Sequence, residues 1–430
     1  MLKRFFDRIK NYFFDKFQTN EFAYVLYPFL RIFKLFGFLP VQLEPNEILN
    51  ENYKFKLDKW SFVATFIGSI VFIVGFYFGV IHLSHTKNLA QLHESTVIAY
   101  FTTWGQIVFL FVLASYGLLN TWFNISKMHG LFLWISKIDH QLEEVTGREL
   151  NYTRMRKKLF IQFFVVFLVP SSLSMVNCIV IHFGPNKIDV WSTCFWFVCF
   201  APILLLTFKE FQFYNLMFVL KTKFDIINKE LLQYGGDNLL SCRKKVKKDV
   251  LNSVKPACST DIIRKLLEIY SNTADCVDLL LKIFGWHLLL LTSASFGVIT
   301  VQGYNLFAAL IVHTMEMDGY QLTVVTGWIV VQILIIGLNV GTCGMTSKAM
   351  SLTGPLLHRI KTNSLTNCSF YLNVELFSFE VLHRKNNFTA AGFIDMDYKL
   401  ITSIIAAVTT YLLIIIQFHF SSLQKKITSD

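Results

Sequence analysis

Seven apolar stretches that contain no Asp, Glu, Lys or Arg limit what this chain can fold into. A helix that crosses the hydrocarbon core of a bilayer needs roughly 20 apolar residues, whereas a core helix of a soluble protein keeps a charged face towards water. Charged residues make up only 16% of the 430 residues, too few for the surface of a soluble protein. The sequence therefore predicts an all-α membrane protein with seven transmembrane helices, at residues 60–83, 95–119, 159–182, 190–208, 284–312, 324–343 and 400–418.

The basic residues between these stretches predict the orientation of the chain. Of its 40 Lys and Arg, 36 lie in alternate segments, which all fall on one side of the predicted membrane: 1–59, 120–158, 209–283 and 344–399. An excess of Lys and Arg marks the cytoplasmic side of a membrane protein. We therefore expect a cytoplasmic N-terminus and, after seven crossings, an extracellular C-terminus.

The long segments on the predicted cytoplasmic side contain helical patterns that would continue the transmembrane helices below the bilayer. Residues 221–234 carry apolar side chains at helical spacing. Ser259, Thr260 and Asp261 are typical of a helix N-cap and precede an apolar stripe that runs into the fifth predicted span. We therefore expect cytoplasmic helix extensions, one of which begins at these three residues.

The N-terminal segment predicts contact with lipid. Residues 1–18 interleave five basic residues with aromatic and aliphatic ones, which is typical of an amphipathic helix that lies on an anionic leaflet. Membrane lipids are therefore an expected partner. The net charge of +11 fits a cytoplasmic surface that faces the membrane, and the sequence contains no basic domain that would bind nucleic acid.

The sequence contains no pattern that would support catalysis or hold a metal or cofactor. CxxC, HExxH, P-loop and GxGxxG motifs are absent, and the apolar stretches lack the charges that an intramembrane enzyme would need. Repeated halves, which are typical of transporters, are also absent. We predict that the protein is not an enzyme and has no catalytic residue, metal site or cofactor.

The seventh stretch carries a narrow stripe of mostly small or polar residues on an otherwise aliphatic helix. Steps of four and three residues place the stripe on one helix face. Such a face avoids lipid, either because it packs on another helix or because it lines water. Composition leaves both interpretations open, although the Gln417 carboxamide favours the second. The stripe consists of Ser403, Ala407, Thr410, Ile414, Gln417 and Ser421.

Three segments resemble motifs of the insect gustatory receptor family. Residues 410–418 read Thr-Tyr, five aliphatic residues, Gln and Phe, which is similar to the signature that closes the last helix of this family. Residues 388–393, Phe-Thr-Ala-Ala-Gly-Phe, resemble the segment before that helix, and residues 27–40 resemble the opening motif. The predicted span count and orientation agree with this resemblance.

The resemblance implies a ligand-gated, non-selective cation channel in the plasma membrane of sensory neurons. Such a channel passes monovalent and divalent cations and assembles as a tetramer, either of one chain or together with related receptors. In the family, the seventh helix of each subunit lines a central pore. By this motif match, Ile414, Gln417 and Phe418 correspond to the pore constriction of the family. Thr410 and Tyr411 correspond to the start of its pore motif.

On this interpretation the chain divides into five parts. They are a cytoplasmic amphipathic region (1–59), a six-span ligand-binding bundle with long cytoplasmic helices (60–343), a cytoplasmic connection with the start of the pore helix (344–399), the pore-lining seventh span (400–418) and an extracellular tail (419–430).

A small-molecule tastant would bind among the first six spans, in a cavity that opens outward. Aromatic and amide side chains suit small organic ligands, and eight of them lie in the outer halves of the predicted spans. Trp and Tyr are also common as anchors at the membrane interface, so both explanations stay open for each residue. The eight are Tyr100, Trp104, Trp191, Trp196, Gln302, Tyr304, Trp328 and Gln332.

The sequence leaves the tastant and two related functions open. We expect a bitter or other non-volatile compound ahead of a sugar. An insect odorant receptor channel would share the fold and orientation, but the N-terminal motif and the Gln417-Phe418 ending favour the gustatory branch. A G-protein-coupled chemoreceptor would need an extracellular N-terminus, which the distribution of basic residues opposes.

Overall fold

The computed structural model consists almost entirely of helices, as predicted. Four of them are 40 to 52 residues long: α5 (Val97–Thr146), α8 (Val190–Gly235), α10 (Pro256–Phe307) and α11 (Gly319–His358). At about 1.5 Å per residue, a helix of about 50 residues spans roughly 75 Å, more than twice the hydrocarbon core of a bilayer. The structure describes residues 41–45, 53–57, parts of 63–78, and residues 97–147, 153–163, 169–173, 190–235, 256–312, 319–360 and 368–429.

Shorter elements complete the described part of the chain. The remaining helices are α6 (Thr153–Phe163), the π-helical continuation of α10 named η2 (Ala308–Val312), α12 (Cys368–His383) and α13 (Tyr398–Ser429). Two antiparallel hairpins pair β1 (Val41–Pro45) with β2 (Tyr53–Leu57) and β3 (Thr389–Ala390) with β4 (Ile394–Asp395). Val41 lies opposite Leu57 in the first hairpin, and Thr389 opposite Asp395 in the second.

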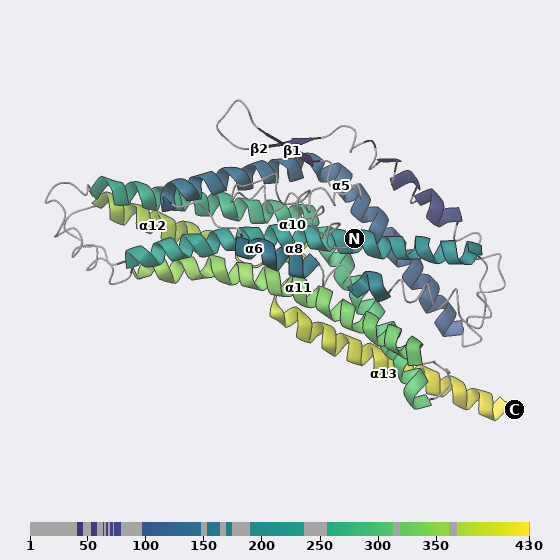
Figure 1. The fold of residues 1–430 in the computed structure, drawn as a ribbon. Helices are drawn as coiled ribbons and strands as arrows, with labels where there is room; N and C mark the ends of the chain where they lie inside the picture. Colours follow the sequence, from purple (N-terminus) through teal and green to yellow (C-terminus); the bar gives the residue numbers. More distant parts are fainter. Residues whose placement is uncertain are drawn as a thin grey trace.

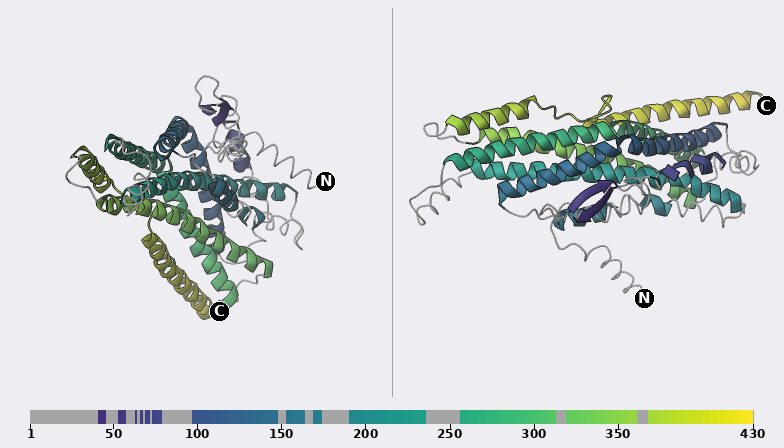
Figure 2. Two further views of the ribbon diagram at one scale, coloured as in Figure 1. Left: turned by 60° about the vertical axis from the view of Figure 1, so that its left-hand side comes forward. Right: turned by 90° about the horizontal axis from the view of Figure 1, so that it is seen from above.

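The long helices run side by side as one elongated bundle (Figure 1). α10 contacts α5, α8, α11, α12 and α13, so most of the described helices pack against it. α12 lies at one end of the bundle and the C-terminal end of α13 at the other (Figure 1). Both views in Figure 2 place α13 along the outside of the bundle rather than within it.

Four helices in the described residues are long and apolar enough to cross a membrane: Val108–Thr146, Thr260–Ile311, Leu322–His358 and Tyr398–Ser421. They contain most of the fifth, sixth and seventh predicted spans and the second half of the second, most of which lies within α5. The fourth predicted span, 190–208, lies within α8. Of the first and third, 60–83 and 159–182, the structure describes helical pieces only, and their remainder lies outside the described residues.

The main hydrophobic core lies where the helices have passed the ends of the apolar stretches. We call this region the extension bundle: residues 120–146 of α5, 209–235 of α8, 256–283 of α10, 344–358 of α11, and α12. Tyr270 of α10 is fully buried there, and its ring lies edge-on to Phe224 of α8 and Phe377 of α12 at 5.3 and 5.4 Å. The predicted helix extensions are therefore confirmed, and their side of the membrane stays a prediction.

Buried polar side chains mark the border between the apolar stretches and the extension bundle. Nζ of Lys209 in α8 donates a hydrogen bond to Oγ1 of Thr121 in α5 at 2.7 Å. The adjacent Glu210 carboxylate accepts a hydrogen bond from Nδ2 of Asn339 in α11 and lies 3.0 Å from Nε2 of His287 in α10. A buried charge is costly without partners, so these contacts favour one register of the four long helices.

The start of α10 differs from the predicted one. The helix begins at Pro256, so the prediction that Ser259, Thr260 and Asp261 form its N-cap is wrong. Proline suits the first turn because its ring fixes φ near the helical value and because an N–H there would have no partner within the helix. The helical prediction for 221–234 is confirmed, since these residues lie within α8.

Replacing Lys223 with Met should destabilise the extension bundle. Lys223 of α8 is fully buried and forms an ion pair with Asp139 of α5, and burial lowers the pKa of Lys223 well below its usual value. Removing one partner of a buried ion pair typically costs about 3–5 kcal/mol because the other charge stays buried. We expect a lower melting temperature for the detergent-solubilised protein in fluorescence-detected size exclusion.

Lys229→Met is the matched control, because Lys229 lies on the same helix with its side chain exposed. Equal melting temperatures for the two variants would show that the Lys223–Asp139 pair does not stabilise the bundle.

Candidate functional site

The last helix, α13, carries the motif that sequence analysis assigned to a pore, and Asp397 fixes where this helix begins. Oδ1 of Asp397 accepts hydrogen bonds from the backbone N–H groups of Lys399 and Leu400 at 2.9 and 3.3 Å. These N–H groups have no acceptor within the helix. The adjacent Tyr398 ring packs on Gly344 of α11, where an added Cβ would lie 2.8 Å from Cε2 of the ring. The start of α13 is therefore held by a cap and by close packing.

The β3–β4 hairpin joins α12 to α13 and rests on α10. Its turn places Ala391 and Gly392 at φ values of 53° and 81°, in the left-handed region that tight hairpin turns require. The backbone nitrogen of Ala391 approaches α10 at Gly285, where an added Cβ would lie 3.0 Å from that nitrogen. The Phe-Thr-Ala-Ala-Gly-Phe segment is thus a tight connection that needs a glycine on the helix beneath it.

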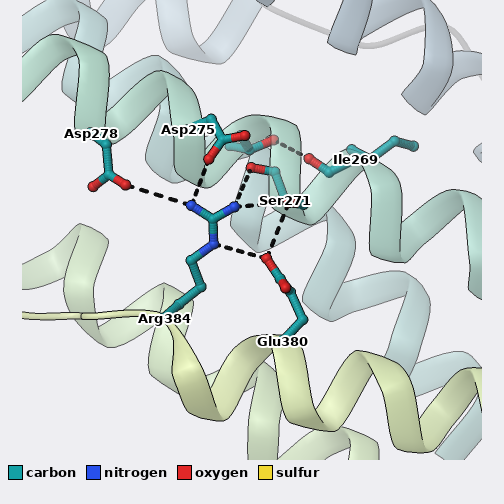
Figure 3. A network of polar contacts seen from close by, with 7 residues as sticks. Ile269, Ser271, Asp275, Asp278, Glu380 and Arg384 are labelled. Carbon is teal, nitrogen blue, oxygen red and sulfur yellow. Dashed lines mark hydrogen bonds and ion pairs between the residues drawn. The ribbon is translucent and has the colours of Figure 1, made fainter.

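Arg384, which follows α12, ties the end of that helix to α10 (Figure 3). Nη1 donates to Oδ1 of Asp275 at 2.6 Å and lies 3.5 Å from Oδ2 of Asp278. Nε donates to Oε1 of Glu380 at 2.9 Å, and Nη2 donates to Oγ of Ser271 at 2.8 Å. Figure 3 shows the guanidinium group between the carboxylates of the two helices. We call these five residues the Arg384 clasp.

The electrostatics of the clasp favour the charged guanidinium. Partial burial lowers the pKa of Arg384, but hydrogen bonds and charge interactions with Asp275 and Glu380 outweigh this effect and raise the pKa above its usual value. The hairpin begins five residues after Arg384. The clasp and the Gly285 contact therefore act together to set where α13 starts.

The side chains of the predicted pore residues are exposed within this chain. Tyr411, Ile414 and Phe418 have exposed fractions of 53%, 40% and 69%, and Thr410 and Gln417 are exposed as well. Oγ1 of Thr410 donates to the backbone carbonyl four residues earlier at 2.9 Å, so the hydroxyl is satisfied within the helix. The chain leaves these side chains open to lipid, to water or to another subunit, and their role in a pore stays a prediction.

α10 contacts the back of α13 at three levels. Leu412 packs over Gly303, where an added Cβ would lie 3.3 Å from Cδ1 of the leucine. The ring of Phe296 lies edge-on to that of Tyr411 at 5.6 Å. Near the C-terminal end of α13, Tyr304 forms a hydrogen bond of 2.9 Å with Nδ1 of His419. These contacts hold the helix along the side that carries Leu412 and His419.

Among the predicted ligand residues whose side chains the structure describes, no hydrogen bond joins one to another. Four have described side chains, Gln302 and Tyr304 in α10 and Trp328 and Gln332 in α11. Oε1 of Gln332 accepts a hydrogen bond from Ser295 of α10 at 2.7 Å, Gln302 bonds within its own helix, and Tyr304 bonds to α13. The other four lie in helices, but their side chains lie outside the described residues: Tyr100 and Trp104 in α5, and Trp191 and Trp196 in α8.

Sequence analysis missed the contacts that position α13, namely the Arg384 clasp, the approach at Gly285 and the Tyr304–His419 pair. Each joins residues more than 100 positions apart. In the sequence, Arg384 is simply one more basic residue on the predicted cytoplasmic side. Of these three contacts, only the one at Gly285 has a local signal in the sequence, because a small residue in an apolar helix can mark the close approach of another segment.

Comparisons with known proteins agree with the predicted type of protein. A family model described as "7tm Chemosensory receptor" matches residues 26–422. Gustatory and pheromone receptor 32a of Drosophila melanogaster is 31% identical over 155 residues, which are 36% of this chain and only 31% of that relative. The candidate gustatory receptor 2a of the same organism is 23% identical over 359 residues, which cover 77% of this chain and 81% of that protein.

The fold is similar to solved structures of the insect olfactory receptor OR5 from Machilis hrabei. One structure matches with a TM-score of 0.59 and 12% identity, over 91% of this chain and 97% of that chain. The structure of the same receptor in complex with eugenol also gives a TM-score of 0.59, at 14% identity over 91% and 98% of the two chains. At these identities the likeness concerns the fold, and it confirms the predicted all-α, seven-helix class.

Arg384→Gln should loosen α12 and the β3–β4 hairpin from α10. Glutamine keeps much of the side-chain length but removes the charge, and losing a hydrogen bond to a charged group typically costs about 1.5–3 kcal/mol. We expect faster hydrogen–deuterium exchange in residues 384–397 and a melting temperature that is lower by several degrees. Lys385→Gln changes the exposed neighbouring residue and should leave both unchanged. The same exchange rates in both variants would contradict a stabilising role for the clasp.

Proposed function

Since the chain belongs to the 7tm chemosensory receptor family, we propose that it is a gustatory receptor of sensory neurons that acts as a ligand-gated, non-selective cation channel. The observation that carries this proposal is the exposed side of α13. Thr410, Ile414, Gln417 and Phe418 are uncovered there, on an apolar helix that its own chain contacts from the back. A polar amide on such a helix favours water or a partner subunit over lipid.

Four copies of α13 around one axis would turn this side into a pore. Rings of Ile414 and Phe418 would form an apolar constriction, and a dry constriction blocks ions without a charged plug. Rotating or splaying the helices would bring the Gln417 amides to the lumen, which would then fill with water and pass monovalent and divalent cations. A single helix cannot enclose a pore, so the proposal requires the tetramer.

α12 supports the assembly of several copies. One side of this short helix is buried through Val374, Phe377 and Val381. The opposite side is apolar but exposed, with Leu372, Leu376, Phe379 and Leu382 uncovered. A row of large exposed apolar side chains outside the membrane is typical of an interaction surface. In the cytoplasm, where the basic residues place α12, further copies of the chain would cover it.

The ligand would be a small molecule that enters an outward-facing cavity among the first six spans. The eugenol complex of the Machilis olfactory receptor supports small-molecule binding in this fold. The similarity to gustatory and pheromone receptor 32a favours a tastant over an odorant, and a bitter or other non-volatile compound stays the first expectation, ahead of a sugar. An odorant receptor channel of the same fold is the alternative.

Expression in a heterologous cell line should give ligand-evoked cation currents that survive blockade of G proteins. A panel of bitter compounds and sugars, with eugenol as the probe for the odorant alternative, would be applied during whole-cell recording and calcium imaging. Cells transfected with an empty vector are the control. A response that disappears under blockade would contradict the channel and favour a G-protein-coupled receptor.

Leu376→Glu combined with Phe379→Glu should break the assembly. Both side chains lie on the exposed apolar side of α12, and burying a carboxylate without a partner costs several kcal/mol. We expect the wild type to run as a fourfold assembly in mild detergent and the variant as a single chain, by size exclusion with light scattering. Glu375→Gln, at an exposed position on the same helix, is the control and should stay assembled. A monomeric wild type would contradict the pore.

A further inference from the structure

α13 has one buried side chain in its apolar part. Among residues 401–421, His419 alone is buried, with an exposed fraction of 3%. Its Nδ1 lies 2.9 Å from the hydroxyl of Tyr304 in α10, which is itself only 2% exposed. Two buried polar side chains from different helices thus form a hydrogen bond immediately beside Gln417 and Phe418 of the predicted constriction.

The surroundings of this pair are apolar and closely packed. The rings of Tyr304 and His419 meet edge-on with centres 5.9 Å apart, and one turn further along α10 the ring of Phe307 lies edge-on to Phe420 at 6.4 Å. The aromatic contacts tolerate sliding, whereas a hydrogen bond weakens steeply when its donor turns away from its acceptor. The polar pair is therefore the part of this seam that depends most on the rotation of α13.

Helix geometry connects this pair to the constriction. At about 100° per residue, Gln417 lies roughly 200° around the helix from His419 and Ile414 roughly 140°, both measured in the same direction. Holding His419 against α10 therefore points Ile414 and Gln417 away from it. A rotation that changes which of these side chains faces a central axis must move His419 away from Tyr304.

We propose that the Tyr304–His419 hydrogen bond is a rotational lock of the pore helix, in which both side chains are positioning residues that hold the closed setting of the gate. The proposal rests on the proposed channel function and adds the element that controls it. Tyr304 lies two residues from Gln302, one of the predicted ligand residues, so a ligand that displaces this turn of α10 would release α13 directly.

Spontaneous opening tests the lock without a known ligand. The full-length protein, reconstituted into planar bilayers, is recorded in the absence of any tastant. Tyr304→Phe, which removes only the hydroxyl, and His419→Leu should each raise the open-to-closed ratio by roughly 2- to 10-fold per subunit, the equivalent of one lost hydrogen bond. Single-channel conductance should stay the same, because neither side chain lines the proposed constriction.

Two further variants separate the hydrogen bond from packing. His419→Asn keeps a polar atom close to the position of Nδ1 and should restore the ratio towards that of the wild type. Tyr77→Phe makes the same chemical change as Tyr304→Phe at an exposed position and should change nothing. If His419→Asn opens as often as His419→Leu, or if Tyr304→Phe behaves as the wild type, the lock is wrong.

A variant of the constriction shows whether a negative result contradicts only the proposed lock or also the proposed channel. Ile414→Gln combined with Phe418→Gln replaces both apolar rings with polar ones, so that the proposed pore should stay wet and conduct constantly. If this variant conducts but Tyr304→Phe and His419→Leu have no effect, the proposed lock is wrong and the proposed channel is still supported. If this variant also fails to conduct, the channel is overturned and the lock with it.

Discussion

Contacts with α10 position α13 along most of its length, and the start of α13 also packs on α11 at Gly344. The hairpin that precedes α13 rests on Gly285, Leu412 packs over Gly303, and His419 bonds to Tyr304, all on the one helix. In the opposite direction along α10, Asp275 holds Arg384. A displacement of α10 would therefore act directly on the hairpin before α13, on its middle and on its C-terminal part.

Among the residues that the structure describes, packing is most extensive in the extension bundle. The large core and the Lys223–Asp139 pair lie there, whereas the described part of the apolar stretches contributes a smaller cluster around Leu113 and Leu291. Local opening costs least where few apolar contacts are broken. The ligand and the constriction are proposed outside the extension bundle, which has the most extensive packing in the described residues.

The sequence predicts this protein best where the signal is local. Runs of uncharged apolar residues identify α5, α10, α11 and α13, because a bilayer requires such runs, and the Thr410-to-Phe418 motif singles out one helix. The start of α10 was misplaced because Pro256 and Ser259 are both good helix starts. The Arg384 clasp and the Tyr304–His419 pair could not be predicted, since each depends on a distant helix that no local pattern specifies.

The free energy of a single hydrogen bond suits the proposed gate. Its net contribution is about 1 kcal/mol, which one subunit would lose easily if, as proposed, a ligand moved α10. If four subunits turn together, as a shared constriction requires, the four bonds amount to about 4 kcal/mol, or roughly a thousandfold bias towards the closed state. A stronger contact, such as a buried ion pair at His419, would demand more differential binding energy than a weakly bound tastant can supply. A single hydrogen bond in this seam therefore fits the proposed gate, which would stay shut at rest and still respond to a small molecule.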